Sequence, residues 1–371
     1  MRLPYLGRGS PRPGQISGKI HAMMRTLPPA ASWAVRLALT AVLCLSVLAA
    51  CSPAPTSTAP AATETPAQPP TPEPTLTPTL LPAKAVLITA GADAQTAQQA
   101  AEMLSAAAAS AGLLSETREQ VQPAEIGPEW KAVIFLNAPQ NLAELTAAAP
   151  QTQFLAVTGQ DTQAGGNLTV VRVRPEFQAF VAGYLSVITA ADWRSAALLP
   201  NDGPLGTRLE EAYKNGGAYF CGICNSVYGP IMRFPAAISL PSSSDAVAWQ
   251  MAVDELNKNY IYLYYVSAEA ARDVRILPYL ASQNIILIGA QTPPAEVMPR
   301  WAATLQFDIL TPLQEALPQV LAGQGGQALN AGLRLVDTQS GLISPARLGM
   351  AEKVIKELSE GWIEPFTPPL Q

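Results

Sequence analysis

The residues of this chain that could do chemistry are mostly neutral and polar, and they stand at the ends of short apolar runs. Such side chains donate and accept hydrogen bonds, which suits the capture of a polar organic solute. The candidate binding residues are Asp93, Asn137, Thr158, Gln160, Asn201, Asp202, Ser267, Gln291 and Asp308. Because Gly, Asn, Asp and Ser also favour the turns that follow strands, turn formation is the competing interpretation for each of them.

The histidine content argues against catalysis. The only histidine is His21, which lies in the segment that we expect to be removed on export. A mature chain without histidine has no Ser-His-Asp or Cys-His nucleophile and no His-ligated zinc or iron site. An enzyme would have to rely on lysine chemistry or on carboxylates alone, such as Asp93, Asp161 or Asp202. We therefore expect no enzymatic activity, no metal and no cofactor.

The N-terminal part carries an export signal. Leu48-Ala49-Ala50-Cys51 closes an apolar run, residues 37–50, that follows Arg36. A basic flank, a short apolar core and small residues before a cysteine are typical of a bacterial lipoprotein signal peptide. The alternative is a transmembrane helix, but the run is shorter than the ~20 residues that span a bilayer. We expect residues 1–50 to be cleaved and lipid on Cys51 to anchor the chain to the outer face of the plasma membrane.

The segment after this cysteine differs in composition from the rest. Within residues 51–83 the chain is almost wholly Pro, Thr, Ala, Ser and Glu, without hydrophobic periodicity. This composition predicts a disordered, partly polyproline linker, which at ~3.1 Å per residue would reach on the order of 100 Å when fully extended. The linker would hold a folded body away from the lipid surface.

The folded body shows the alternation of an α/β protein. Apolar runs predict strands at 85–89, 131–136, 154–157, 168–173, 195–199, 261–266 and 284–288, with helices over 93–111, 141–149, 176–190, 205–213, 245–256 and 270–282. Continuous apolar strands alternating with helices indicate parallel sheets covered on both faces. The pattern occurs once before and once after about residue 175, which predicts two doubly wound lobes. Doubly wound sheets bind ligands beyond the carboxyl ends of their strands, where the polar candidates stand.

The charge of the chain is mildly acidic, with a formal net charge of −5 and 49% apolar residues. No basic tract follows the signal segment, so nucleic acid is not expected as a partner. The apolar content is sufficient for the large core of a bilobal body.

Two cysteines remain in the folded body, in Cys221-Gly222-Ile223-Cys224. Outside the cytoplasm a structural disulfide is the usual fate of two thiols this close. A thioredoxin-type redox pair is an alternative, but it needs the first cysteine at a helix N-terminus, whereas this pair follows a helical segment and a Gly216-Gly217 break. Free thiols are the third possibility.

The segment Arg174–Tyr184, RPEFQAFVAGY, shows a family resemblance. It resembles the Glu-x-x-Ala-Phe-Leu-Ala-Gly signature of the basic membrane protein family of substrate-binding lipoproteins, which are type 1 periplasmic binding proteins of ABC importers. The resemblance implies two lobes joined by a multi-crossover hinge, with lobe 1 at 84–172 and 303–330 and lobe 2 at 173–302 and 331–371. It also implies an ABC permease as partner and a small-molecule solute held between the lobes.

Several positions depart from the nucleoside-binding members of that family. The stretch 91–96 lacks their stacking phenylalanine, and the expected carboxylates fall at Thr158 and Gln291. The family's late lysine falls near Asp308. Since each missing buried partner typically costs ~1–3 kcal/mol, these neutral replacements disfavour a nucleoside.

We therefore expect a lipid-anchored, extracytoplasmic solute-binding protein of an ABC importer that acts as a monomer. The alternative is a non-transport ligand sensor, or an envelope interaction module, of the same fold.

Overall fold

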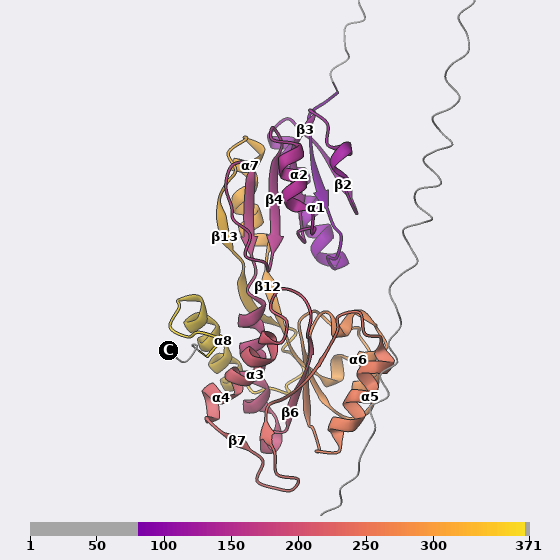
Figure 1. Ribbon diagram of the computed structural model, residues 1–371, viewed down its shortest axis with the longest axis vertical. Helices are drawn as coiled ribbons and strands as arrows, with labels where there is room; N and C mark the ends of the chain where they lie inside the picture. The colour runs from indigo at the N-terminus through magenta and orange to yellow at the C-terminus, as the bar shows by residue number, and fades with distance from the viewer. Residues whose placement is uncertain (1–80, 368–371) are drawn as a thin grey trace, which may run out of the picture. The chain divides into compact units, whose positions relative to one another are not determined.

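The computed structural model describes residues 81–367. The expected signal peptide, the lipid site at Cys51 and nearly all of the linker lie outside the described residues. The described residues belong to one compact unit, in which two six-stranded sheets are each covered by helices on both faces (Figure 1). The expected α/β fold class is confirmed.

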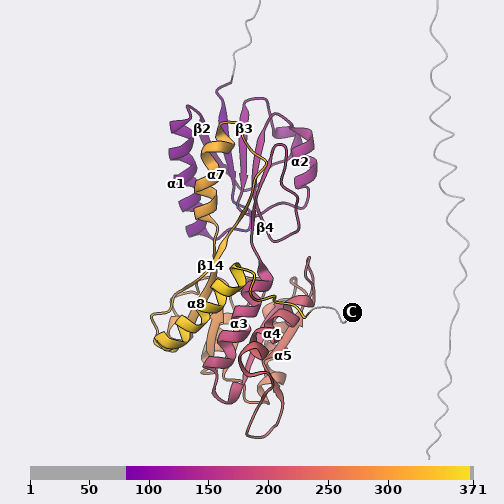
Figure 2. The ribbon, with the colours of Figure 1, turned by 90° about the vertical axis from the view of Figure 1, so that its left-hand side faces the viewer.

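The first sheet is wholly parallel, in the order β13-β5-β4-β3-β1-β2. Its strands are β1 (Lys84–Ile88), β2 (Leu114–Arg118), β3 (Trp130–Phe135), β4 (Gln153–Thr158), β5 (Leu168–Arg172) and β13 (Ala328–Asn330). Helices α1 (Ala94–Ser110) and α7 (Leu310–Leu321) cover one face, and α2 (Leu142–Ala148) covers the other (Figure 2).

Burial on both faces explains why the strands of this sheet read as continuous apolar runs. In β1, Ala85 and Leu87 pack with α1 and α7. The alternate residues Val86 and Ile88 pack on the side of α2. Successive side chains of a strand point to opposite faces, so both sets must be apolar.

The second sheet has the order β14-β12-β11-β10-β6-β9, and only the β12–β14 pair is antiparallel. Its strands are β6 (Ser195–Pro200), β9 (Ala236–Leu240), β10 (Leu263–Val266), β11 (Ile286–Gly289), β12 (Trp301–Asp308) and β14 (Gly332–Val336). Its helices are α3 (Pro175–Thr189), α4 (Arg208–Cys221) and α8 (Pro345–Ser359), with α5 (Ala246–Asn257) and α6 (Ile276–Ser282) on the other face (Figure 1). A short hairpin pairs β7 (Cys224–Asn225) with β8 (Arg233–Phe234). Short 3₁₀ turns occupy Pro123–Glu125, Ala191–Trp193, Ala270–Arg272 and Met298–Arg300.

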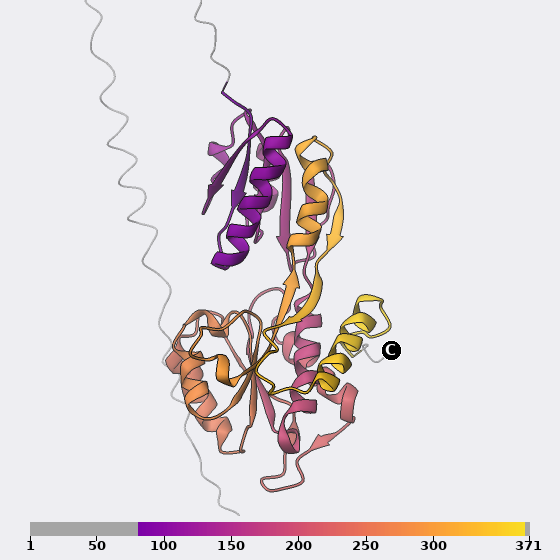
Figure 3. The same ribbon diagram turned by 180° about the vertical axis from the view of Figure 1, so that it is seen from behind.

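Within the described residues the chain passes between the two sheets three times: from β5 to α3, from β12 to α7, and from β13 to β14 (Figure 3). The expected boundary at 302/303 falls inside β12, which pairs with β11 and β14 as far as Asp308. The crossover therefore follows Asp308. The reason is that the apolar run Trp301–Leu305 is fully buried in the second sheet and continues its pairing.

Helices α3 and α4 pack backbone to backbone. A Cβ added at Gly183 of α3 would overlap the carbonyl oxygen of Tyr213, and one at Gly216 of α4 would overlap that of Phe180. Helix α4 runs through Gly216 and Gly217 to Cys221, so the break expected there does not occur. The glycines are explained by this close approach of two helices, which favours small residues over helix propensity.

Candidate functional site

The carboxyl ends of strands from both sheets enclose a cavity of about 410 Å³. From the first sheet it is lined by residues at or just after the ends of β1, β3 and β4, including Gly91, Asp93, Asn137, Thr158 and Gly159. From the second sheet come Ala268 after β10, then Ala290, Gln291 and Thr292 after β11. We call this cavity the strand-end cavity. Its place is the one where doubly wound folds bind ligands.

The structure brings most of the sequence-predicted binding residues to this region. Asp93, Asn137, Thr158 and Gln291 line the strand-end cavity itself. Gln160 lines an adjoining cavity of about 360 Å³, which shares Gly159 and Val173 with it. Asp308 lines another of about 260 Å³, which shares Gln95, Thr96, Thr292 and Gln306.

The other three predicted residues hydrogen-bond to other protein groups and do not line these three cavities. The side-chain amide of Asn201 donates to the carbonyl oxygen of Ser239 at 3.2 Å. The Asp202 carboxylate accepts from the backbone N–H of Ser242 at 3.0 Å, and these bonds lower the pKa of Asp202. The Ser267 hydroxyl accepts from the N–H of Ala270 at 3.2 Å. Asn201 and Asp202 thus join the turn after β6 to β9 and the turn that follows it, and Ser267 stabilises the turn after β10.

Local geometry fixes the first-sheet side of the strand-end cavity. Asp93 caps helix α1, because its carboxylate accepts from the N–H of Thr96 at 2.9 Å. The hydroxyl of Thr158, which is buried, accepts from the N–H of Gln160 at 3.0 Å. Asn137 lies against Gly91, where a Cβ would stand 2.8 Å from the Asn137 amide nitrogen. Gly91 also has a φ of +73°, which L side chains rarely adopt.

This contact predicts that Gly91→Val weakens solute binding at least about tenfold, because it displaces the Asn137 amide from its position. The matched control is Gly112→Val, which has a similar φ of +69° but open space around its Cβ position. Both variants carry similar backbone strain, so their thermal stabilities should fall alike, and calorimetric titration should separate them. Equal affinity in the two variants would argue against a role for Asn137.

The second-sheet side is held by a polar network that the sequence reasoning missed. The Asp337 carboxylate accepts from the hydroxyls of Thr292 at 2.8 Å and Thr304 at 2.7 Å. The indole N–H of Trp301 donates to Thr304 at 2.8 Å. Antiparallel pairing of β12 with β14 brings Asp337 next to Thr304, 33 residues away in sequence. The network positions the loop after β11, which carries Gln291.

The residues that line the strand-end cavity are almost free of charge. They include one carboxylate, Asp93, and neither arginine nor lysine. The remaining polar groups are amides and hydroxyls, and the apolar side chains include Leu136, Val157, Phe307 and Ile309. A neutral solute with several hydrogen-bonding groups fits this lining, since a charged one would be desolvated without a partner.

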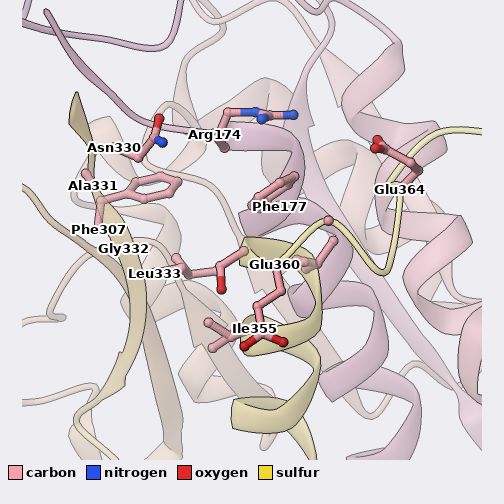
Figure 4. Close-up of a pocket in the computed structure, with 13 residues that line it drawn as sticks. Arg174, Phe177, Phe307, Asn330, Ala331, Gly332, Leu333, Ile355, Glu360 and Glu364 are labelled. Atoms are coloured by element: carbon pink, nitrogen blue, oxygen red, sulfur yellow. The ribbon is translucent and has the colours of Figure 1, made fainter. Parts of the chain in front are cut away.

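A second cavity, of about 460 Å³, lies beside the crossovers and the end of α8 (Figure 4). Figure 4 shows Phe177 and Phe307 among its walls, with Arg174 near its rim. The Arg174 guanidinium forms an ion pair with Glu176 and lies 4.3 Å from the ring centroid of Phe177. The Arg174 guanidinium is thus already paired within the protein. This makes the second cavity a weaker candidate for the solute-binding site than the strand-end cavity. Phe307 lines both cavities.

The two cysteines of the folded body form a disulfide, with their Cα atoms 5.5 Å apart. Cys221 is the last residue of α4, so it lies at the C-terminal end of a helix. The helix dipole lowers a thiol pKa only at the N-terminal end, so this arrangement suits a structural bond and not a redox pair.

Within residues 81–367, no group of three or more His, Cys, Asp or Glu residues could hold a metal ion. In the same range, no helix is both long and apolar enough to cross a bilayer.

Comparison with known proteins identifies the fold. Neither a family model nor a curated protein matches the chain. Among solved structures, an ABC transporter solute-binding protein from Conexibacter woesei is 15% identical, covering 76% of this chain and 98% of its own, with a TM-score of 0.57. One from Aeropyrum pernix is 13% identical over 78% and 94%, with a TM-score of 0.58. The chain has the fold of solute-binding proteins.

The same fold occurs in a protein with another description. A transcriptional activator of the comK gene from Bacillus halodurans is 12% identical, covers 76% of this chain and 99% of its own, and has a TM-score of 0.57. At these identities the likeness concerns the fold alone. The resemblance to the basic membrane protein family stays a prediction.

Proposed function

We propose that this chain is a lipid-anchored, extracytoplasmic solute-binding protein of an ABC importer. The observation that carries the proposal is the strand-end cavity, which is lined from both sheets by neutral hydrogen-bonding groups. Each sheet with its helices forms one lobe, and the three crossovers form the hinge about which the lobes close on the solute. A membrane permease then receives the solute. The fold shared with ABC solute-binding proteins supports this assignment.

The solute that the lining favours is small, neutral and rich in hydroxyl or amide groups. Asn137 and Gln291 each offer a donor and an acceptor, and Thr158 offers a hydroxyl. Phe307 supplies an aromatic wall for a ring or a carbon skeleton. Sugars and polyols meet these requirements best, and a nucleoside meets them only in part.

A thermal-shift screen of the mature chain tests the proposal. The panel holds neutral sugars and polyols, nucleosides, free amino acids and short peptides. A solute at a hundred times its dissociation constant adds about 2.7 kcal/mol to the free energy of unfolding, a shift of a few degrees. We expect neutral polyhydroxylated compounds to raise the melting temperature. Shifts caused only by charged compounds, or none across the panel, would refute the proposed solute class.

The sensor alternative is favoured by one observation, the equal likeness of the fold to a transcriptional activator. Uptake of a radiolabelled hit from the screen distinguishes the two functions. An importer component predicts that deletion of the gene reduces uptake. A sensor predicts unchanged uptake and a loss of the transcriptional response to the same compound.

The lipid anchor is tested separately through Cys51, which lies outside the described residues. We expect the wild-type protein in the membrane fraction, with the mass of its mature N-terminus raised by the acyl groups. Cys51→Ser should release most of the chain from that fraction, since the acyl chains supply most of the membrane affinity. A wild-type chain without added mass would exclude lipidation.

A further inference from the structure

The β7–β8 hairpin, with the two residues that lead into it, covers residues 222–234 and lies at the amino ends of the second-sheet strands. Arg194 directly precedes β6, and its guanidinium donates to the carbonyl oxygens of Tyr228 and, at 3.3 Å, Pro230. The same group donates at 2.6 Å to Asn259, which lies shortly before β10. The strand-end cavity is at the carboxyl ends of these strands. The hairpin is therefore at the opposite edge of the second sheet.

Buried and charged groups hold the hairpin in place. Arg194 is only 3% exposed, and its Nε donates to the Asp192 carboxylate at 3.0 Å. That carboxylate also accepts from the backbone N–H groups of Val227 at 2.6 Å and Tyr228 at 3.3 Å. These bonds, that from Val227 foremost, lower the pKa of Asp192. The Cys221–Cys224 disulfide closes the base of the hairpin.

The backbone that supplies these groups is strained. Asp192 and Trp193 have φ angles of +52° and +60°, in the left-handed region that non-glycine residues seldom adopt. Strain of this kind persists only where surrounding contacts enforce it, and it is common at functional sites. The fold thus fixes the hairpin, whose Cys224 and Phe234 are buried in the core of the second sheet.

The tip of this fixed hairpin exposes apolar side chains. Val227 is 71% exposed, Tyr228 73% and Ile231 65%, and Ile223 at its base is 67% exposed. Tyr260, whose ring centroid is 5.9 Å from the Arg194 guanidinium carbon, is 62% exposed beside them. We call these five residues the hairpin patch. Several large apolar side chains exposed around one hairpin make it a candidate interaction site.

The chemistry of the patch fits a lipid surface. Residues 222–233 include one cation, Arg233, and no acidic residue, so an anionic membrane would not repel them. Tyrosines are enriched at the membrane–water interface, where the ring is apolar and the hydroxyl is hydrated. Aliphatic side chains such as Val227 and Ile231 enter the boundary between headgroups and acyl chains.

The length of chain outside the structure places the patch within reach of the membrane. The 29 residues 52–80 separate Cys51 from the described body and span at most roughly 100 Å. The tether joins the body at β1 in the first sheet, at the end of the body opposite β7, so it must run along both lobes to bring the patch to the membrane (Figure 1).

We propose that the hairpin patch rests in the headgroup region of the membrane to which the chain is tethered. The proposal rests on the lipid anchor of the proposed function. Docked in this way, the second sheet turns its cavity-bearing edge away from the lipid, so the contact must be released before a membrane permease receives the solute.

Site-specific labelling tests this contact. The lipidated mature chain with Val227→Cys is labelled with the fluorophore NBD and reconstituted in vesicles of phosphatidylethanolamine and phosphatidylglycerol at 3:1. Lipids with doxyl groups on their acyl chains then quench any label that enters the membrane. The control is Val274→Cys, which is 68% exposed beside the carboxyl-end edge of the same sheet. We expect at least twofold stronger quenching at position 227 than at position 274.

Further variants separate the patch from the tether. Tyr228→Ser with Ile231→Ser should remove most of the quenching at position 227 while the chain stays on the vesicles. Equal quenching at positions 227 and 274 would overturn the proposal. So would a concentration-dependent dimer in detergent that the double variant abolishes, since the patch would then bind a second copy.

The anchor is measured independently of the patch. The mass of the vesicle-bound chain reports lipidation of Cys51. If that mass shows no lipid, a Cys51→Ser chain held by an N-terminal hexahistidine tag on nickel-chelating lipid gives the same quenching test. Failure of the anchor and failure of the patch are therefore distinguishable.

Discussion

Gly183→Ala is expected to lower the free energy of unfolding by about 3 kcal/mol, the upper part of the range for overpacked cores. The added methyl group would overlap the carbonyl oxygen of Tyr213, a backbone atom of α4. Because the overlapped atom belongs to the backbone, it cannot rotate away as a side-chain atom could. Helix α4 would have to move as a whole to relieve the overlap. Urea unfolding followed by circular dichroism measures the effect.

The matched control for this substitution is Gly349→Ala. Gly349 is exposed in the interior of α8, and nothing lies within 4 Å of its Cβ position. Alanine is favoured over glycine in a helix by roughly 0.5–1 kcal/mol, so the control should be stabilised slightly. Equal stabilisation by both substitutions would contradict the close helix contact. A loss at Gly183 alone would assign the glycine of the EFQAFVAG segment a packing role.

Asn137→Ala combined with Gln291→Ala is expected to weaken solute binding by a hundredfold or more. The two amides come from different sheets and line the same cavity. A hydrogen bond lost from a buried site costs about 1–3 kcal/mol, which is roughly 5- to 150-fold in affinity for each residue. Titration calorimetry with a hit from the solute screen measures the change.

The control for the double variant is Gln140→Ala. Gln140 is exposed, lies three residues after Asn137 and does not line the strand-end cavity. Its affinity should stay within twofold of wild type, and the melting temperatures of all three proteins without solute should be similar. If the double variant bound as tightly as wild type, the solute would have to bind elsewhere.

The sequence pattern predicted the central strands better than the edge strands. β1, β3 and β4 are buried on both faces, so they read as continuous apolar runs. β2 at the edge of the first sheet is LSETR and largely exposed, and nothing in its composition marks it as a strand. β13, with three residues, gains its strand conformation only from pairing with β5.

The helix α4 shows where local signals mislead. Gly216-Gly217 lowers helix propensity, and the sequence therefore predicted a break. The structure continues the helix through both glycines, because close packing on α3 outweighs that propensity. Only the tertiary contact distinguishes a glycine that ends a helix from one that allows two helices to approach.

The sequence predicted those residues of the candidate site that lie at the carboxyl ends of strands. Asn137, Thr158 and Gln291 lie at or just after the carboxyl ends of parallel strands, so their meeting at one edge follows from the fold class. Asp337 joins the site through the antiparallel pairing of β12 with β14, and Phe307 lies near the end of β12, just before a crossover. Neither of these could be inferred from residue types or spacing.

Hydrogen–deuterium exchange of the mature chain, with and without a hit from the solute screen, tests most directly whether the strand-end cavity binds the solute. We expect slower exchange in segments 89–96, 136–139 and 290–292, which contain residues that line that cavity from both sheets. Protection confined to 330–333 and 355–364, around the second cavity, would contradict this expectation.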